Sequence, residues 1–263
     1  ATMYAVRTAR AYTGRNGVVK IEGGYHGSYD PLMVSSKPSV DNAGDPHLPN
    51  SVTPYGAVPG DVWVAPYNNA EAIEEIFKKH RNEIACLIME PVLENIGIVL
   101  PDAGYLERVR ELCTEYDIIL IFDEVITGFR LARGGAEEYF GVTPDLWCFG
   151  KVIGGGLPVG AFGGSTRVMS YLAPLGPVYQ AGTLSGNPLA TAAGRTVLSQ
   201  LTSESYRELS RRVADFAGEL GQAITASGLS CATPTVGPLM GLYLSREPFV
   251  TPTNFDEARS RSR

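Results

Sequence analysis

The residue whose type and position most clearly suggest chemistry is a lysine that follows a short apolar run. Lys151 comes after the apolar residues 146–149 and Gly150, and three glycines follow it at 154–156. Burial beside apolar residues favours a neutral amine, which forms an imine with an aldehyde. The alternative is a strand-end lysine whose stem packs on apolar neighbours while its ammonium reaches water.

Two observations within the sequence favour the nucleophile. The chain has five lysines, and the other four lie in polar settings: Lys20, Lys37, Lys78 and Lys79. A phosphate-binding P-loop is excluded, because it would require Gly at position 145 and Ser or Thr at position 152, where Asp145 and Val152 stand. Lys151 is therefore predicted to be a reactive amine.

An aspartate at the end of another apolar run could act together with this amine. Asp123 follows the run IILIF at residues 118–122, so its carboxylate leaves a buried strand and needs a cation or a strong donor. A protonated pyridine nitrogen would serve, and a cationic ring is an electron sink that lets a substrate α-proton leave. Asp123 could instead cap the next turn, or bind Mg²⁺ as a Walker-B carboxylate does. The Mg²⁺ alternative is less favoured, because a Walker-B carboxylate accompanies a P-loop and this chain has none.

Two further strand ends carry polar side chains. Tyr25 and His26 follow a predicted strand at 18–22 and a turn of two glycines, and the segment EPVLEN at 90–95 follows a predicted strand at 84–89. Ligands of open α/β sheets gather at the ends of strands. The aromatic and polar residues of these two segments, Asn95 among them, are therefore predicted to face the same site as Lys151 and Asp123.

The elements that must position these residues alternate regularly along the chain. Apolar strands and amphipathic helices predict an α/β fold with a mainly parallel sheet covered by helices on both sides. A helix ending at Gly14 precedes them. The strands are expected at 18–22, 62–65, 84–89, 118–122 and 146–149, and the helices between them at 70–80 and 104–116.

The C-terminal part predicts a second, smaller unit. Helices are expected at 188–201 and 204–226, and a short strand at 239–244 begins a small domain. We therefore divide the chain into a large domain at 1–202 and a connecting helix with the start of a C-terminal small domain at 203–263. Residues 28–60 contain six prolines, and a structureless loop of that length is typical of a lid or a disordered segment.

Composition narrows the class of protein. The 263 residues are 44% hydrophobic and 19% charged with a net charge of −6, so no basic surface is expected to bind nucleic acid or an anionic membrane. No apolar run approaches the roughly 20 residues that span a bilayer. The four cysteines are widely spaced, which predicts reduced thiols in a cytoplasmic protein rather than a zinc site or disulfides. A small-molecule substrate is favoured, and no metal is predicted.

Three motifs in this order resemble the class III (fold type I) aminotransferases, which depend on pyridoxal 5'-phosphate. They are IFDEVITGFR at 121–130, GKVIGGGLPVG at 150–160 and GTLSGNP at 182–188. Within that family the stretch YQAGT at 179–183 is most similar to the glutamate-1-semialdehyde 2,1-aminomutases. The resemblance runs over nearly the whole chain, so it implies amino-group transfer on an amino acid or amino-aldehyde.

The resemblance also implies roles for individual residues. Lys151 matches the lysine that holds the cofactor as an internal aldimine and later moves the substrate proton. Asp123 matches the partner of the pyridine nitrogen, while Val125 and Tyr25 match the side chains on the two faces of the ring. Asn95 matches the amide bonded to the phenolic oxygen. Taken singly, Tyr25 and Val125 could be core residues and Asn95 a turn former.

The third motif implies a site shared between two subunits. Thr183, with the backbone of Gly182, matches the segment that reaches the phosphate of the neighbouring subunit's cofactor, so a homodimer is expected. The alternative for Thr183 is a helix cap. The family's Ser-Gly-Thr phosphate-binding segment is expected before Ala1, and the rest of the small domain after residue 263. An isolated chain is therefore expected to hold the cofactor weakly or not at all.

The proline-rich loop leaves the substrate open. Where the aminomutases carry Gly-Ser-Gly in a gating lid, this chain has SSKPS at 35–39. Proline fixes its own φ and restricts the preceding residue, so closure of the lid should differ. An aminomutase, an intermolecular aminotransferase acting on another amino acid or amine, and a non-catalytic truncated product that retains the fold are the three alternatives.

Overall fold

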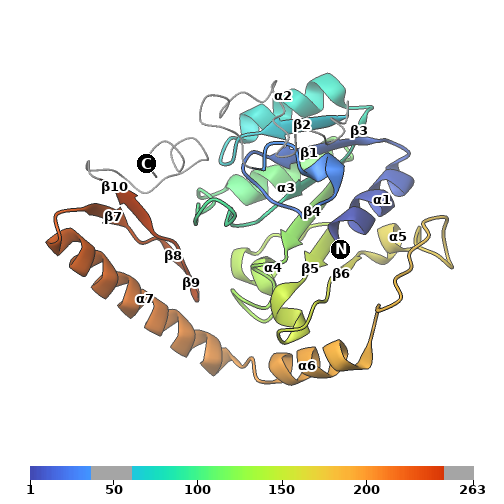
Figure 1. The fold of residues 1–263 in the computed structure, drawn as a ribbon. Coiled ribbons are helices and arrows are strands. Elements are labelled where there is room, and N and C mark those ends of the chain that lie inside the picture. Colours follow the sequence, from blue (N-terminus) through green and yellow to red (C-terminus); the bar gives the residue numbers. More distant parts are fainter. Residues whose placement is uncertain (37–60, 246–263) are drawn as a thin grey trace.

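A computed structural model of the chain describes residues 1–36 and 61–245 and contains a central six-stranded sheet (Figure 1). The strand order is β2-β1-β3-β4-β5-β6. The first five strands are parallel to their neighbours, and β6 pairs with β5 antiparallel. The mainly parallel α/β fold predicted from the sequence is confirmed. The strands are β1 Gly17–Ile21, β2 Val62–Ala65, β3 Ile84–Met89, β4 Ile119–Glu124, β5 Leu146–Phe149 and β6 Ala161–Gly164.

Helices cover both faces of this sheet, which explains why its strands are apolar without interruption. The helices α2, Ala70–His80, and α3, Tyr105–Glu115, pack on one face. The helix α1, Thr2–Thr13, packs on the other. Successive side chains of a strand alternate between the faces, so in β1 Val19 joins the α2–α3 core while Val18 joins the α1 core.

Helix boundaries follow local capping chemistry. Helix α1 ends at Gly14, as predicted, where a left-handed φ of 68° lets the Gly14 N–H donate to the Arg10 carbonyl. Helix α2 has its predicted bounds, and the side chain of Asn69 caps it by accepting a 2.9 Å bond from the Ala72 N–H. The helices α3, α6 (Pro188–Ser199) and α7 (Ser203–Ala226) differ from their predicted bounds by one or two residues, as is usual at frayed ends.

Three strand predictions need correction. Strand β1 starts and ends one residue earlier than predicted. Strand β4 runs beyond 122 because its pairing with β5 continues through Asp123 and Glu124, so Asp123 lies within the strand. The predicted strand at 239–244 is two strands in two separate sheets, β9 Leu239–Met240 and β10 Tyr243–Ser245. Gly241 separates them, and its N–H donates to the Pro234 carbonyl.

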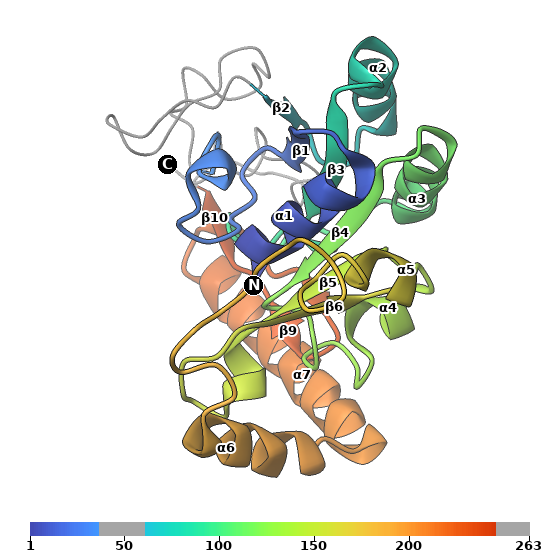
Figure 2. The same ribbon diagram turned by 90° about the vertical axis from the view of Figure 1, so that its right-hand side faces the viewer.

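The remaining small sheets and helices lie outside the main sheet. Strand β9 pairs with β8, Thr235–Val236, and β10 pairs with β7, Ser230–Ala232. Figures 1 and 2 show α6 below the sheet, and Figure 1 shows α7 running from the end of α6 towards β7 and β10. The proposed domain boundary between 202 and 203 stays a prediction. The short helices are η1 Asp30–Leu32, α4 Gly135–Phe140, η3 Lys151–Gly154 and α5 Thr166–Met169.

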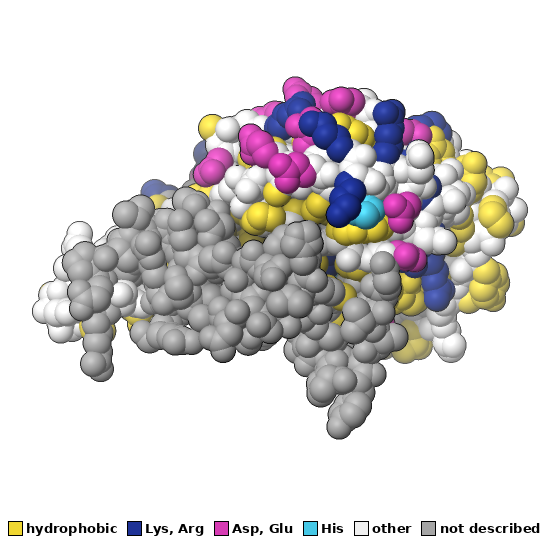
Figure 3. Space-filling model, turned by 90° about the horizontal axis from the view of Figure 1, so that it is seen from above, with side chains coloured by type: hydrophobic (Ala, Val, Ile, Leu, Met, Phe, Trp, Pro, Cys, Tyr) yellow, Lys and Arg dark blue, Asp and Glu magenta, His cyan; other side chains and the backbone are white. Residues whose placement is uncertain are grey.

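Charged side chains of both signs mix on the face over α2 and α3 (Figure 3). Glu74 there pairs with Lys78 at 2.7 Å and with Arg108 at 3.4 Å. No helix in the described part of the chain is long and apolar enough to cross a membrane. Most of the predicted lid, 37–60, lies outside the described residues.

Candidate active site

The ends of the parallel strands surround a cavity of about 530 Å³. Six residues predicted for the site line it together: Tyr25, His26, Asn95, Asp123, Val125 and Lys151. They come from segments that follow β1, β3 and β5, and from the end of β4. Parallel strands bring these carboxyl ends to one edge of the sheet, so residues separated by up to 126 positions meet there.

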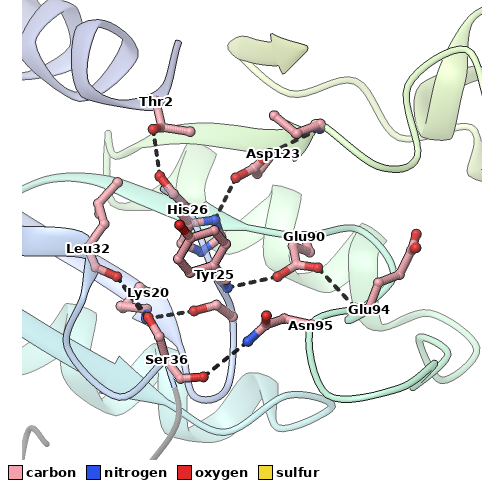
Figure 4. A network of polar contacts seen from close by, with 12 residues as sticks. Thr2, Lys20, Tyr25, His26, Leu32, Ser36, Glu90, Glu94, Asn95 and Asp123 are labelled. Carbon is pink, nitrogen blue, oxygen red and sulfur yellow. Dashed lines mark hydrogen bonds and ion pairs between the residues drawn. The ribbon is translucent and has the colours of Figure 1, made fainter. Parts of the chain in front are cut away.

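Two buried side chains of the cavity lining, His26 and Asp123, are hydrogen-bonded to each other (Figure 4). Nδ1 of His26 lies 2.8 Å from Oδ2 of Asp123, and the two residues are only 1% and 4% exposed. The other oxygen, Oδ1, accepts a 3.1 Å bond from the Val125 N–H. Asp123 therefore does cap the following turn, as the alternative prediction held, and it also has a charged or polar partner in His26.

His26 is oriented by its surroundings. Since Nδ1 faces a carboxylate, it carries the hydrogen, and the backbone carbonyl of His26 accepts a 2.7 Å bond from Thr2 Oγ1. Nε2 is buried and has no partner among the described residues. A Cβ at Gly24 would lie 3.1 Å from this nitrogen, so the glycine before Tyr25 lets the chain pass close to the ring.

A second buried carboxylate holds the segment that carries Tyr25. Glu90 Oε1 accepts a 2.9 Å bond from the Tyr25 N–H, and Oε2 accepts a 3.0 Å bond from the Glu94 N–H. Burial raises the pKa of Glu90, and that of Glu94 to about 8. Glu90 belongs to the segment EPVLEN at 90–95 that was predicted to face the site, but no role was predicted for Glu90 itself. The Tyr25 side chain is 44% exposed.

Asn95 presents its amide oxygen to any ligand in the cavity. Its Nδ2 donates to the carbonyl oxygens of Gly23 at 2.8 Å and Ser36 at 3.1 Å. Two carbonyl acceptors require the NH₂ group on that side of the amide. The oxygen Oδ1 is therefore the atom with which Asn95 could contact a bound group.

Lys151 has an unusual backbone conformation. Its φ is 45°, in the left-handed region, directly after Gly150 at the end of β5. Such a conformation costs a residue with a side chain roughly 1–3 kcal/mol and is found most often at functional sites. Contrary to the prediction, the Lys151 side chain is exposed rather than buried, because the turn lifts it out of the sheet into the cavity mouth. Burial therefore does not supply its nucleophilicity here.

Two predicted residues lie elsewhere. Gly182 and Thr183 are exposed and do not line the cavity in the described part of the chain. The helix-cap alternative for Thr183 is wrong, because the side chain of Asn187 caps α6 by accepting a 2.9 Å bond from the Ala190 N–H.

Two buried charged residues were missed. The prediction that Lys20 lies in a polar setting is wrong, because Lys20 is fully buried in β1. Glu124 is buried beside Asp123, and its Oε2 accepts bonds from the Ala136 N–H at 2.6 Å and Thr127 Oγ1 at 3.2 Å. Burial raises the pKa of Glu124 to about 7. A Cβ at Gly135 would lie 2.3 Å from this oxygen, so Glu124 holds the turn after Asp123 closed.

Comparison with known proteins assigns this arrangement to a family. The family model described as aminotransferase class-III matches residues 1–230. The chain belongs to this family. Class III aminotransferases of known sequence that it resembles include the glutamate-1-semialdehyde 2,1-aminomutase of Natranaerobius thermophilus, 47% identical over 99% of the chain, and aminomutase 2 of Bacillus licheniformis, 46% identical over 98%. The chain spans 59% of the length of each.

Solved structures of transaminases and of an aminomutase have the same fold. An omega-transaminase from Sphaerobacter thermophilus superposes with a TM-score of 0.87 at 34% identity, covering 99% of this chain and 59% of the other. A glutamate-1-semialdehyde aminomutase from Pseudomonas aeruginosa gives 0.83 at 26% identity, covering 98% and 57%. A structure described as a transaminase with PLP bound gives 0.84 at 30% identity, covering 94% and 57%.

Proposed function

We propose that this class III chain binds pyridoxal 5'-phosphate and transfers amino groups, as a transaminase or a 2,1-aminomutase. The observation that carries the proposal is one cavity lined by a strained lysine, Lys151, and a buried carboxylate, Asp123, that a histidine holds in place. A relative of the same fold is described with this cofactor bound.

The side chains present fit this cofactor by their chemistry. The primary amine of Lys151 can bind an aldehyde covalently. Asp123 has an acceptor position left on its carboxylate and can pair with the ring nitrogen. Tyr25 and Val125 can contact the two faces of the ring, and Asn95 Oδ1 can meet its phenolic oxygen. When bound, the cofactor supplies an electron sink that makes the α-proton of an amino substrate acidic.

Each of these residues then has a definite task. The free amine of Lys151 would take the α-proton and return it at the neighbouring position, because it is a basic group of the lining on a long, flexible side chain. Asp123 would hold a negative charge near the ring nitrogen, and the hydrogen bond from His26 would keep that carboxylate from turning away. Glu90 accepts a hydrogen bond from the Tyr25 N–H, so the aromatic ring of Tyr25 stays beside the cavity.

The first prediction concerns the assembly of the protein. We infer a homodimer in which Thr183 reaches the neighbouring site, because the segment around it exposes a row of large apolar side chains: Leu175, Tyr179, Leu184 and Leu189 are 74–82% exposed. Sedimentation of the cofactor-loaded protein should give a dimer, and Leu184→Asp should shift it towards monomer. A stable monomer that binds the cofactor tightly would contradict the shared site.

The second prediction concerns the substrate. The relatives of known sequence named above are aminomutases, whereas an omega-transaminase superposes well. This chain has Lys37 and Pro38 where the family resemblance implies a flexible Gly-Ser-Gly lid in the aminomutases. We expect transfer from a separate amino donor to a separate keto acceptor to be at least as fast as isomerisation of glutamate-1-semialdehyde. An aminomutase must stay closed over its diamino intermediate, and the timing of closure depends on the hinges of its lid.

The experiment supplies glutamate-1-semialdehyde alone, and then an amino donor with a keto acceptor, to the natural protein. The 5-aminolevulinate and the new amine are followed separately. Efficient 5-aminolevulinate formation without intermolecular transfer would show that the protein is an aminomutase. It would also show that the lid substitution does not change the reaction. If the protein shows no visible absorbance from bound cofactor, the non-catalytic alternative holds instead.

We also propose a cytoplasmic location. The four cysteines are unpaired, and Cys86, Cys113 and Cys148 are buried in the sheet and its helices. Reduced, buried thiols are typical of proteins kept in a reducing compartment.

A further inference from the structure

Lys20 occupies a position where a charged side chain is rare. It lies in β1, a strand with neighbours on both sides, and it is 0% exposed. Its side chain shares the face of Val18, which packs in the α1 core with Leu32 and Val34. A lysine is almost never buried in this way without specific partners.

The partners of its amine are all oxygen acceptors. Nζ donates to the carbonyl oxygens of Gly24 at 2.9 Å and Leu32 at 3.2 Å, and also contacts the carbonyl of Val34. Ser36 Oγ lies 3.1 Å away. Burial lowers the pKa of Lys20 to about 7, while the carboxylates of Glu90 and Glu22 oppose that shift. A site made of oxygens favours the ammonium, which has three donors and no lone pair.

All four acceptors belong to one loop that builds the candidate active site. The loop covers residues 24–36, and Tyr25 and His26 stand at its beginning (Figure 4). At its end the Ser36 carbonyl accepts from Asn95 Nδ2, and the Ser35 carbonyl accepts from the Gly23 N–H at 2.8 Å. The loop therefore closes on itself around the amine of Lys20. Its beginning lines the cavity, and its end holds Asn95, which also lines the cavity.

We propose that Lys20 is a positioning residue, whose ammonium holds the 24–36 loop in the shape that places Tyr25, His26 and the anchor of Asn95 around the cofactor. That the loop surrounds a cofactor rests on the proposed function, whereas the effect of Lys20 on the shape of the loop does not. The four residues that accept hydrogen bonds from Lys20 do not line the cavity, so Lys20 acts on the lining through the loop that they belong to. Three charge-assisted bonds to one loop are strong enough to define its conformation.

The first arm of the test uses the whole chain without any ligand. Lys20→Met keeps the length of the side chain and removes its donors. Amide hydrogen exchange should become at least about tenfold faster in residues 23–36, the loss expected for one charge-assisted bond, and stay unchanged in α2. Lys79→Met, at an exposed lysine of α2, is the matched control. Unchanged exchange in 23–36, or equal acceleration throughout the sheet, would overturn the proposal.

A second variant keeps the test decisive if Lys20→Met does not fold. Ser36→Ala removes one acceptor from the loop and no atom from the sheet, so it should give a smaller acceleration confined to 23–36. Lys20→Arg retains a cation and should restore part of the protection. Wild-type exchange of residues 23–36 in Ser36→Ala would overturn the proposal whether or not Lys20→Met folds.

The second arm adds pyridoxal phosphate to the natural protein. Lys20→Met should still bind it covalently through Lys151, but the visible circular dichroism of the bound ring should fall several-fold, because that signal reports ordered surroundings. A merely stabilising core lysine would lower the melting temperature and leave this signal intact, which would refute the positioning role. If the wild type binds no cofactor, the proposed function fails, while the hydrogen exchange still decides the role of Lys20.

Discussion

Lys151→Ala is expected to abolish covalent capture of pyridoxal phosphate and to reduce amino-group transfer by at least about 10⁴-fold. The variant loses both the amine that binds the aldehyde and the base that moves the α-proton. Borohydride reduction of the loaded wild type, followed by mass analysis of its peptides, should find the cofactor on the peptide that contains Phe149, Gly150 and Lys151. The variant should carry no reduced label there.

The structure makes this variant a clean test. The Lys151 side chain is exposed, so its removal leaves no cavity in the core, and alanine meets the same left-handed φ of 45° as lysine does. The melting temperature should therefore stay close to that of the wild type. Lys151→Gly should even raise it slightly, because glycine adopts this conformation without strain. Reduced label on Lys20 or Lys37 in the wild type would remove Lys151 from the proposed mechanism.

The central sheet could be predicted because its strands are buried on both faces. β3 and β4 contain six residues each with every side chain buried, which leaves an unbroken apolar signal in the sequence. The residues that follow such strands must meet at one edge of the sheet. Six of the eight predicted site residues were found together for that reason. Strand β6 was missed because Ala161, Gly163 and Gly164 have weak strand propensity.

Other features depend on partners that sequence neighbours do not reveal. Lys20 is buried because carbonyl groups up to 14 residues later surround its amine, and nothing in its strand indicates that loop. The pairing of His26 with Asp123 spans 97 positions. The exposure of Lys151 follows from one backbone angle in the turn. Each of these features depends on contacts with segments or turns that fold back against the sheet. The local sequence pattern contains no information about such contacts.

Asp123→Asn should leave cofactor attachment possible and reduce turnover by roughly 10²–10³-fold, the usual cost of removing one electrostatic contact with developing charge. The carboxylate of Asp123 accepts from His26 Nδ1 with one oxygen and from the Val125 N–H with the other. An asparagine offers a single acceptor, so its NH₂ group must face one of these donors. The variant therefore loses the charge under the ring and also strains the turn.

These two losses can be separated by measurement. The strain should lower the melting temperature of the protein with and without cofactor, whereas loss of charge should lower kcat at unchanged cofactor content. His26→Gln is the matched control: it breaks the same contact but leaves the carboxylate charged, so its melting temperature should fall similarly and its kcat much less. If Asp123→Asn melts earlier but turns over at a near-normal rate, Asp123 serves the turn and His26 rather than the cofactor, and the electrostatic part of the proposed mechanism is wrong.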